Sequence, residues 1–397
     1  MQRRSQTAVL AAASLLLAAG CSSGGAQPEK SGPSDDATAK SPGTAAPATP
    51  TATPSPSAPP AKGSVKVTAT LTTGLKSPWG VAPLPGGDLL VASRDTGDVF
   101  RVAADGKKTL LGSVPGVEPG GEGGLLGLAV SSDFGADHLV YAYFTTATDN
   151  RIARMIYDEK RPPGIQLGQP DTIFKGIPKG QIHNGGRIAF GPDKMLYAGT
   201  GETGDTGLAQ DKESLGGKIL RMTPDGEPAH GNPSAESVVY DYGHRNVQGL
   251  AWDGEKRLWA SEFGQDTWDE LNLIEPGKNY GWPEAEGKAK GAKGGAAGSG
   301  FMDPVAQWKT ADASPSGIAY AKGSIWMAGL RGERLWRIAL NGTKPVGAPQ
   351  AFLEGEYGRL RTVVAAGDGG LWLVTSNTDG RGDTRKGDDR ILHLKVS

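Results

Sequence analysis

Apolar positions between residue 64 and the end of the chain rarely follow the spacing of an amphipathic helix. They form short apolar or aromatic stretches that are separated by turns containing Gly, Pro, Asn and Asp. Short stretches of this kind, bounded by turn residues, are typical of β-strands. The pattern therefore predicts an all-β domain over residues 64–397.

One phrase recurs six times along this region, and each copy is a turn followed by apolar or aromatic residues. The leucine or isoleucine of each copy lies 46 to 67 residues from the next, which is close to the length of a four-stranded propeller blade with its loops. Six copies predict a six-bladed β-propeller, and a two-sheet sandwich repeated twice is the alternative. The six residues are Leu89, Leu139, Leu196, Leu258, Ile325 and Leu371.

The first residues have the features of a secretion signal. Arg3 and Arg4 precede the apolar run Ala8–Ala19, which is shorter than the ~20 residues of a membrane-spanning helix. Small residues then lead to Cys21, the only cysteine, and this resembles the lipobox of bacterial lipoproteins, although its leucine lies four places before the cysteine instead of three. We expect a lipoprotein signal peptide over residues 1–20 and a lipid on Cys21. Ordinary secretion with an incidental Cys21 is the alternative.

Residues 21–63 consist largely of Pro, Ala, Thr, Ser, Gly and Lys, and such a segment buries too little apolar surface to fold. It is predicted to be a disordered tether, with the protein anchored at the extracellular face of the cell membrane through its lipid alone. The domain over residues 64–397 has no cysteine for disulfides, so its core must stabilise it. A net charge of −1 offers no argument for binding nucleic acid.

The first candidate for chemistry is His183, which stands directly before a predicted loop glycine pair and strand. Histidine titrates near neutral pH and is the commonest general base, although a single loop histidine is often structural. The glycine-rich turn over residues 199–205 carries Glu202 and Asp205. A carboxylate near His183 would set the tautomer of its ring, whereas an exposed turn is the alternative reading.

Two further loops carry ligand-binding residue types. Arg245 and Asn246 lie beside glycines, and an arginine offers a fork of donors that suits a planar, polyanionic ligand. The acidic loop over residues 261–270 offers oxygen donors of the kind that calcium prefers, without the spacing of an EF-hand.

Four motifs follow one another along the domain: GGEGGLLGLA (Gly120–Ala129), HNGGRIAFGPD (His183–Asp193), GHRNVQGLAW (Gly243–Trp252), and SEFG followed by DELNLIEPGKNYGWP (Asp269–Pro283). In this order they resemble the glucose/sorbosone dehydrogenase family, and the similarity extends from Ser77 to Leu394. The resemblance implies a six-bladed β-propeller of four-stranded antiparallel blades, with pyrroloquinoline quinone (PQQ) over the channel entrance and calcium beneath it.

The resemblance also implies catalytic roles. His183 matches the base that removes the proton from the anomeric hydroxyl of an aldose, and Glu202 matches the acid that orients it, with Asp205 as a second candidate. Arg245 and Asn246 match the pair that holds the cofactor and stabilises its reduced, anionic form.

Calcium ligands and a substrate contact follow from the same resemblance. The backbone carbonyls of Gly264 and Gln265 match those that hold the catalytic calcium, and Glu270 and Tyr280 match a second, structural calcium site. Glu122 stands where the family often has a substrate-lining glutamine.

Arginines complete the implied cofactor site. Arg359 and Arg361 match the pair that clamps the carboxylates of the cofactor. In the pair Leu330–Arg331, arginine stands where the glucose-oxidising branch has lysine, which keeps the charge and changes the geometry. Ile182 replaces an acid of that branch, so the broader aldose dehydrogenase branch is the better match.

The resemblance therefore implies an oxidoreductase that converts an aldose to a lactone and passes electrons to an external acceptor. A calcium-dependent sugar lactonase is one alternative, but it would need convergent carboxylates and would have no use for Arg359 and Arg361. A non-catalytic binding propeller is the other. Whether the domain is a monomer or a dimer is left open.

Overall fold

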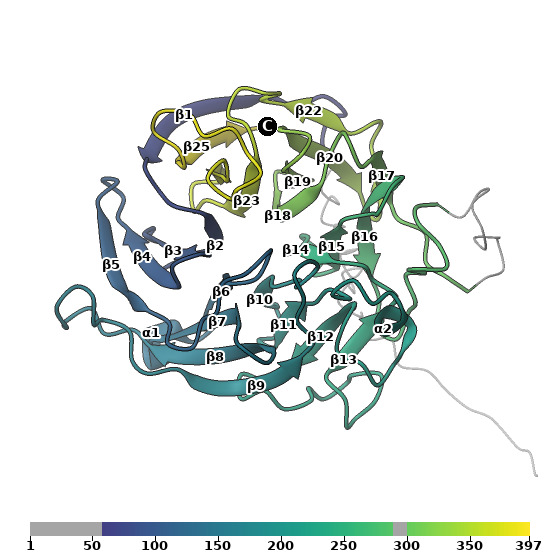
Figure 1. Ribbon diagram of the computed structural model, residues 1–397. Helices are drawn as coiled ribbons and strands as arrows, with labels where there is room; N and C mark the ends of the chain where they lie inside the picture. Colours follow the sequence, from purple (N-terminus) through teal and green to yellow (C-terminus); the bar gives the residue numbers. More distant parts are fainter. Residues whose placement is uncertain (1–57, 289–299) are drawn as a thin grey trace, which may run out of the picture. The chain divides into compact units, whose positions relative to one another are not determined.

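The computed structural model describes residues 58–288 and 300–397. Within these residues, strands form six separate antiparallel sheets arranged around a central channel, with two single-turn helices in the loops (Figure 1). The chain is thus a six-bladed β-propeller, as the repeat predicted. The predicted signal peptide, Cys21 and residues 21–57 of the predicted tether lie outside the described residues. No helix in the described part is long and apolar enough to cross a membrane.

Blades 1 to 5 follow one another along the chain, each from its innermost to its outermost strand. The strands of blades 1 and 2 are β2 (Pro78–Pro83), β3 (Leu89–Ser93), β4 (Asp98–Val102), β5 (Lys108–Ser113), β6 (Leu125–Val130), β7 (Leu139–Thr145), β8 (Asn150–Ile156) and β9 (Asp171–Ile177). Those of blades 3 and 4 are β10 (Ile188–Phe190), β11 (Leu196–Gly199), β12 (Lys218–Met222), β13 (Val239–Tyr242), β14 (Val247–Trp252), β15 (Leu258–Glu262), β16 (Trp268–Ile274) and β17 (Ala306–Lys309).

Blade 5 has a divided outer edge, because β21 and β22 both pair with β20. The strands of blades 5 and 6 are β18 (Pro315–Ala321), β19 (Ser324–Gly329), β20 (Leu335–Asn341), β21 (Lys344–Pro345), β22 (Gln350–Phe352), β23 (Leu360–Ala365), β24 (Leu371–Thr375), β25 (Ile391–Val396) and β1 (Val65–Thr72). The helices are α1 (Phe134–Asp137) and α2 (Gly207–Gln210).

Both ends of the domain close the ring. The outermost strand of blade 6 is β1, which pairs with β25 in a register that sets Val65 opposite Val396. The innermost strands contact one another in the cyclic order β2, β6, β10, β14, β18, β23 and back to β2. Because N- and C-terminal strands share one sheet, separating the last blade from the first would require breaking this pairing.

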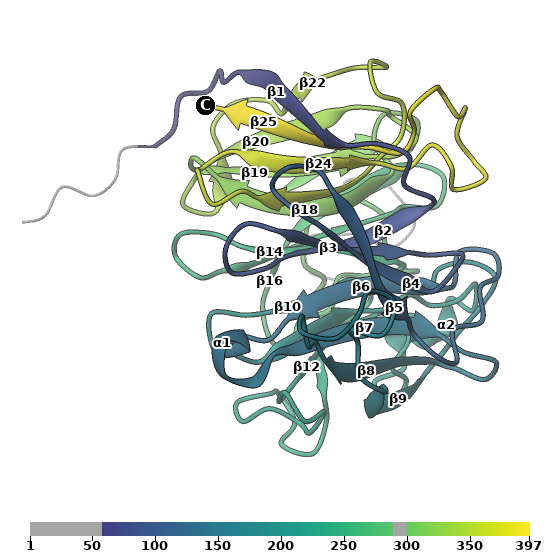
Figure 2. The same cartoon turned by 90° about the vertical axis from the view of Figure 1, so that its left-hand side faces the viewer.

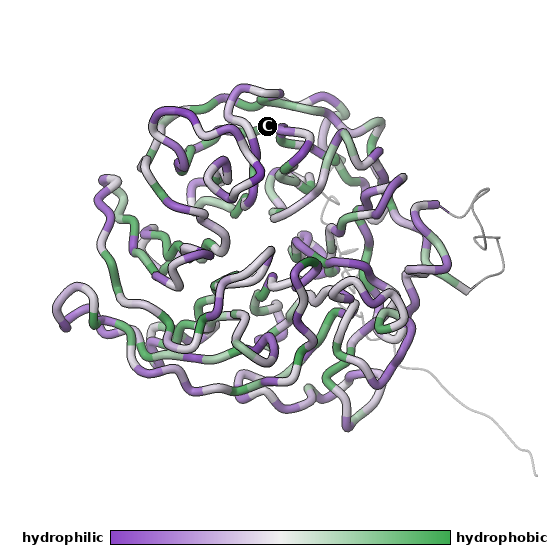
Figure 3. The backbone as a smooth tube through the Cα atoms, viewed as in Figure 1, coloured by the Kyte–Doolittle hydropathy of each residue, from purple (hydrophilic) through white to green (hydrophobic). Residues whose placement is uncertain are grey.

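The hydrophobic core is distributed among the blade interfaces. Neighbouring residues of one strand face opposite interfaces, since Leu125 packs with blade 1 and Leu126 packs with blade 3. Both faces of the central strands are therefore covered, and their sequences are continuous apolar runs instead of alternating ones (Figure 3). Trp259 and Trp326 of the repeated phrase are completely buried in these interfaces.

The innermost strands approach one another too closely for side chains at certain positions. A Cβ on Gly127 would lie 2.1 Å from the carbonyl oxygen of Gly186 in the next blade, and one on Gly80 would lie 2.4 Å from that of Leu126. The close backbone contact around the channel thus depends on glycine.

We expect Gly127→Ala to lower the free energy of unfolding by about 2 kcal/mol or more, because main-chain atoms must move to admit the methyl group. Thermal unfolding monitored by circular dichroism measures the loss. Gly135→Ala is the matched control, since a Cβ at that position in α1 meets nothing within 4 Å. Equal melting temperatures for the two variants would contradict the tight-packing argument.

The antiparallel blades bring two sets of loops to the same end of the channel. These are the loops that precede each innermost strand and the loops that join the second strand to the third. In the side view, α2 in the β11–β12 loop lies at this end, and α1 in the β6–β7 loop lies at the opposite one (Figure 2). Nearly all of the candidate site residues stand in or beside these two sets of loops, at the end of the channel where α2 lies.

The described residues before β1 lie at the opposite end, next to Ser397. Arg337 donates hydrogen bonds to the carbonyl oxygens of Pro60 (3.0 Å) and Ala61 (3.3 Å), and the Gly63 amide donates to Gln350 Oε1 (2.8 Å). Residues 60–63, the last part of the segment predicted as a tether, are therefore fastened to blade 5.

Candidate active site

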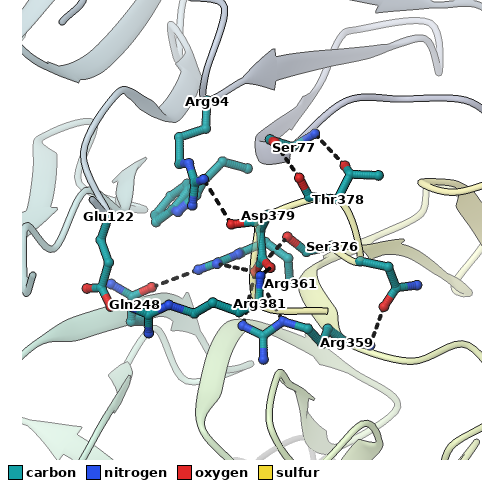
Figure 4. A network of polar contacts seen from close by, with 12 residues as sticks. Ser77, Arg94, Glu122, Gln248, Arg359, Arg361, Ser376, Thr378, Asp379 and Arg381 are labelled. Carbon is teal, nitrogen blue, oxygen red and sulfur yellow. Dashed lines mark hydrogen bonds and ion pairs between the residues drawn. The ribbon is translucent and has the colours of Figure 1, made fainter. Parts of the chain in front are cut away.

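A cavity lies at the loop end of the channel, and every blade contributes to its lining (Figure 4). Six of the lining residues are arginines or acids, and four of these six belong to blade 6 and its loops, so the cavity is strongly polar. The lining residues are Trp79, Arg94, Glu122, Asn184, Gly185, Gln248, Phe263, Leu330, Arg359, Arg361, Asp379 and Arg381.

Register shifts bring three of these side chains to the channel mouth. Five of the six innermost strands shift register against the second strand near their first residues, and Trp79, Gln248 and Arg361 fall within such shifts. An extra residue in a strand re-aims the local side chains, and shifts of this kind are common beside active sites.

His183 and Glu202 form a buried pair. The Nδ1 atom of His183 lies 2.8 Å from Oε1 of Glu202, and Glu202 is only 1% exposed. The other carboxylate oxygen of Glu202 accepts the amide of Gly204. An ionised Glu202 accepts from Nδ1–H and leaves Nε2 as the basic nitrogen, which is the arrangement of an oriented general base.

Asp205 does not contact His183, although it was the second candidate from the sequence. Its Oδ1 accepts the amide of Gly207 at 3.1 Å, within its own exposed turn. Of the two carboxylates in the glycine-rich loop, the structure therefore brings only Glu202 to the histidine.

Glu122 connects His183 with blade 6. Its Oε2 accepts the backbone amide of His183 at 2.9 Å, and its Oε1 lies 3.0 Å from Arg381 Nη2. His183 has a φ of 53°, a left-handed conformation that is uncommon for a residue with a side chain. The hydrogen bond that the amide of His183 donates to Glu122 supports the loop in this conformation, so Glu122 both supports the base and lines the cavity.

Arg245 and Asn246 lie in the loop before β14, as the sequence indicated. Glu262 Oε2 accepts the amide of Arg245 at 2.9 Å, and the guanidinium lies 5.5 Å from the ring centre of Trp282. Asn246 Oδ1 accepts the amide of Gly185 at 3.0 Å, which ties this loop to that of His183. Burial lowers the pKa of Arg245.

Arg359 and Arg361 converge on Asp379. Nε and Nη2 of Arg359 lie 3.1 and 3.0 Å from Asp379 Oδ2, and Arg361 Nη2 lies 3.4 Å from the same oxygen (Figure 4). Burial opposes ionisation of Asp379, but Arg361 and Arg359 outweigh it and lower its pKa. Burial lowers the pKa of Arg361 to about 10, with Arg359 and Arg94 adding to the effect and Asp379 opposing it.

Several cavity residues were missed by the reasoning from sequence. Arg94 donates to the carbonyl oxygen of Asp379 at 3.1 Å, and Arg361 Nη1 lies 3.3 Å from Gln248 Oε1. Arg381 belongs to the same β24–β25 loop as Asp379. Only Gln248 had a local signal, since it stands two residues after Asn246 in a predicted site motif.

Leu330 and Arg331 are neighbours in the chain but lie in different environments. Leu330 lines the cavity and is 2% exposed, whereas Arg331 is exposed and does not line it. A role for Arg331 in cofactor binding remains a prediction.

The loop of the predicted catalytic calcium is organised by a side chain that the sequence did not single out. Glu286 Oε1 accepts backbone amides of four successive residues, 265–268, at 2.7 to 3.1 Å. Gly264, Arg245 and Glu286 line one small cavity. In the described parts of the chain, the carbonyl oxygens of Gly264 and Gln265 accept no hydrogen bond, which leaves them available as ligands.

The predicted structural calcium pair, Glu270 and Tyr280, lines the same small cavity. Burial, together with repulsion from Glu262, raises the pKa of Glu270 to about 8. The hydroxyl of Tyr280 donates to the carbonyl oxygen of Leu273 at 2.7 Å. Across residues 58–288 and 300–397, no three His, Cys, Asp or Glu side chains are grouped to hold a metal, so calcium at these places would depend on backbone oxygens.

His244, the neighbour of Arg245 in the chain, is buried between two carboxylates. Its Nδ1 lies 2.7 Å from Glu262 Oε1 and its Nε2 lies 3.2 Å from Asp241 Oδ1. Burial disfavours the charged ring, but Glu262 and Asp241 outweigh it and raise the pKa of His244 to about 10. The imidazolium therefore neutralises Glu262, which in turn holds the amide of Arg245.

We expect His244→Leu to lower the free energy of unfolding by about 3 to 5 kcal/mol, because it leaves two buried carboxylates without their shared cation. Urea unfolding measures the loss. His393→Leu is the control, since His393 pairs with the exposed Asp368 and should cost less than about 1 kcal/mol. A loss for His244→Leu as small as that of the control would contradict a charged His244.

The donors at the mouth of the channel fit a planar polyanion such as PQQ. The buried donor atoms without a hydrogen-bond partner in the described structure include Arg361 Nε, which belongs to the polar cavity, and Arg245 Nε, which belongs to the small cavity. They also include Nδ2 of Asn246, whose Oδ1 bonds to Gly185 of the polar cavity. Buried donors are seldom left unpaired, and guanidinium groups pair well with carboxylates. Arg245, Asn246, Arg359 and Arg361 are therefore suited to hold such a cofactor.

Comparison with known proteins agrees with this geometry. The family model for glucose/sorbosone dehydrogenase matches residues 75–386. Aldose sugar dehydrogenase YliI of Escherichia coli is 30% identical over 332 residues, which cover 77% of this chain and 89% of that protein. Quinoprotein glucose dehydrogenase B of Acinetobacter calcoaceticus is 32% identical over 244 residues, covering 53% of this chain and 50% of that protein.

A solved structure shows the same architecture. The PQQ-bound aldose sugar dehydrogenase of Streptomyces coelicolor superimposes with a TM-score of 0.83 at 74% identity, covering 86% of this chain and all of that chain. The residues matched by the family model, 75–386, include every residue of the cavity. The chain belongs to the glucose/sorbosone dehydrogenase family.

Proposed function

We propose that this protein is a PQQ-dependent dehydrogenase that oxidises the anomeric hydroxyl of aldose sugars to lactones. The observation that carries the proposal is the buried His183–Glu202 pair, together with the unpaired donors of Arg245, Asn246 and Arg361. Asn184 and Gly185, which follow His183 in its loop, line the same polar cavity as Arg361. Membership in the family and the PQQ-bound relative of Streptomyces coelicolor support it.

In the proposed reaction, His183 accepts the proton of the substrate and Glu202 orients His183. The chemistry that PQQ supplies when bound is acceptance of the hydride from the anomeric carbon of the sugar. Nε2 of His183 takes the proton of the anomeric hydroxyl, so that its oxygen forms the carbonyl of the lactone as the hydride leaves. Glu202 keeps the proton of the neutral ring on Nδ1, and stabilises the charge that His183 acquires.

Arginine and amide groups provide the electrostatic part. Arg245 and Asn246 would hold the cofactor from blade 4, and Arg359 and Arg361 would hold its carboxylates from blade 6. Their positive charge favours the more negative, reduced form of the cofactor, and burial strengthens this effect. Glu122 is placed to contact the sugar, because it lines the cavity and bonds to the loop of the base.

The proposal also includes two calcium ions and attachment of the protein to the cell membrane. The carbonyls of Gly264 and Gln265 would hold a calcium ion that acts as a Lewis acid at the cofactor. Glu270 and Tyr280 would contribute to a second, structural ion. We infer a lipoprotein attached through Cys21 at the extracellular face of the membrane, with an external acceptor taking the electrons.

The two alternatives have less support. A lactonase requires convergent carboxylates and asparagine around a metal, and the described residues contain no group of three or more His, Cys, Asp or Glu side chains placed to hold one. It would also have no use for Arg359 and Arg361. A non-catalytic propeller has no need for an oriented His183–Glu202 pair.

The test is dye-linked oxidation of a panel of aldoses by the purified domain, with PQQ and calcium added together and separately. We expect turnover only when PQQ is present, and a loss of activity after calcium is chelated. PQQ binding without oxidation of any aldose would favour the binding propeller. Hydrolysis of lactones without PQQ would favour the lactonase.

A further inference from the structure

Arg187 is a buried arginine that the proposed mechanism does not use. It stands directly before β10, is 8% exposed, and reaches across the channel to three other blades. Its Nε donates to the carbonyl oxygen of Gln248 at 2.9 Å, and its Nη2 donates to Thr362 Oγ1 at 3.2 Å. The guanidinium lies 4.4 Å from the ring centre of Trp79.

These contacts place Arg187 between two cavities. Trp79 and Gln248 line the polar cavity of the candidate site, whereas Arg187 itself lines a second cavity inside the channel. The other residues of the second cavity come from the innermost strands and are mostly apolar, such as Leu128, Ile188 and Val363. Arg187 thus forms the boundary between the site and an apolar channel.

The charge of Arg187 has no acidic partner within the described residues. The charged group that acts on it is another cation, Arg361, and burial together with Arg361 lowers the pKa of Arg187 to about 9. Arg361 shares its neighbours, because it also contacts Gln248 and lies 5.6 Å from the ring centre of Trp79. A buried cation without a counter-ion is unfavourable unless an anion binds nearby.

We propose that Arg187 is a positioning residue whose charge, acting from beneath the cavity, favours an anionic cofactor and its more negative reduced form. Its charge acts through space, and its contacts with Trp79, Gln248 and Thr362 hold it in place. The inference rests on the proposed function, since PQQ is the anion that would compensate the charge.

The experiment measures the dissociation constant of PQQ for the apo-protein and the midpoint potential of the bound cofactor. Arg187→Gln removes the charge and keeps a donor for the same acceptors. We expect it to weaken PQQ binding at least tenfold and to lower the midpoint potential, whereas Arg187→Lys should restore most of both. If Arg187→Gln does not fold, Arg187→Met serves as the second neutral variant, because its side chain suits the apolar channel.

Two control variants separate charge from structure. Arg337→Gln removes another buried arginine without an acidic partner, at the opposite end of the propeller, and should leave both quantities unchanged. Thr362→Val removes a hydrogen bond of Arg187 and keeps its charge, so the potential should stay near that of wild type.

The outcomes are distinct. A neutral variant that binds PQQ as tightly as wild type, at the same potential, would overturn the inference, even if its melting temperature falls. So would a shift in potential for Thr362→Val as large as that for Arg187→Gln. If wild-type protein fails to bind PQQ at all, it is the proposed function that fails.

Discussion

His183→Ala is expected to lower kcat for aldose oxidation by about 10² to 10⁴-fold, while the dissociation constant of PQQ changes little. The substitution removes the nitrogen that accepts the hydroxyl proton and leaves the arginines of the cavity in place. Steady-state dye reduction measures kcat, and titration of the apo-protein with PQQ measures binding. The essential result is a large fall in kcat with little change in the dissociation constant of PQQ.

Variants of the two neighbouring carboxylates sharpen this test. Glu202→Gln keeps the shape of the side chain but loses the charge that sets the tautomer of His183, so kcat should fall less than in His183→Ala. Asp205→Asn is the matched control, because Asp205 lies three residues away in the same loop and does not contact the histidine. Equal kcat values for wild type and His183→Ala would exclude His183 as the base.

Arg361→Gln is expected to weaken PQQ binding by about 30- to 150-fold, because a hydrogen bond to a charged group contributes roughly 2 to 3 kcal/mol. Arg361 is 7% exposed, and its Nε is a buried donor without a partner. Asp379 would keep Arg359 as its counter-ion, so the domain should remain folded. Fluorescence titration of the apo-variant with PQQ measures the change.

Arg331→Gln provides the comparison for this variant. Arg331 was implied by family resemblance alone and is exposed, so its charge is screened by solvent and its loss should change PQQ affinity less than about threefold. If Arg331→Gln weakens binding as much as Arg361→Gln, the loop after β19 must close over the cofactor. If neither variant weakens binding, the arginine-rich cavity is not the PQQ site.

The local sequence was sufficient to predict the β-strands and the sixfold repeat. Apolar runs such as those at Leu89 and Leu258 form the second strands of their blades, because both of their faces are covered by neighbouring blades. Each run therefore reads as continuous apolar residues between turns, and this signal is local. The number of blades followed from counting copies.

The ring closure was not visible in the repeat. Blade 6 takes its outermost strand from Val65–Thr72, more than 300 residues from its partner β25, as the registered pair Val65 and Val396 shows. No local pattern carries such a pairing, because strand partners are selected by the closure of the whole ring.

The residues of the candidate site could likewise be predicted only in part from the sequence. Sequence motifs and the family resemblance identified His183, Glu202, Arg245 and Arg361, since each lies in a short motif with glycine or a fixed neighbour. The resemblance put Glu202 before Asp205, but the contact itself became visible only in the structure, because it depends on which carboxylate the loop turns toward the ring of His183.

What the sequence by itself determined is the β-strand repeat, the number of blades and the short motifs that carry the base and the arginines. Only the tertiary structure decided the environment of each charge. Asp379 and Arg94 lie 285 residues apart and gave no local signal, yet Arg94 donates a hydrogen bond to the carbonyl oxygen of Asp379. Arg187 stands in one of the quoted motifs, but its burial beside Arg361 became visible only in the structure. The physical reason is that burial and charge pairing depend on distances between blades, which are established only when the ring closes.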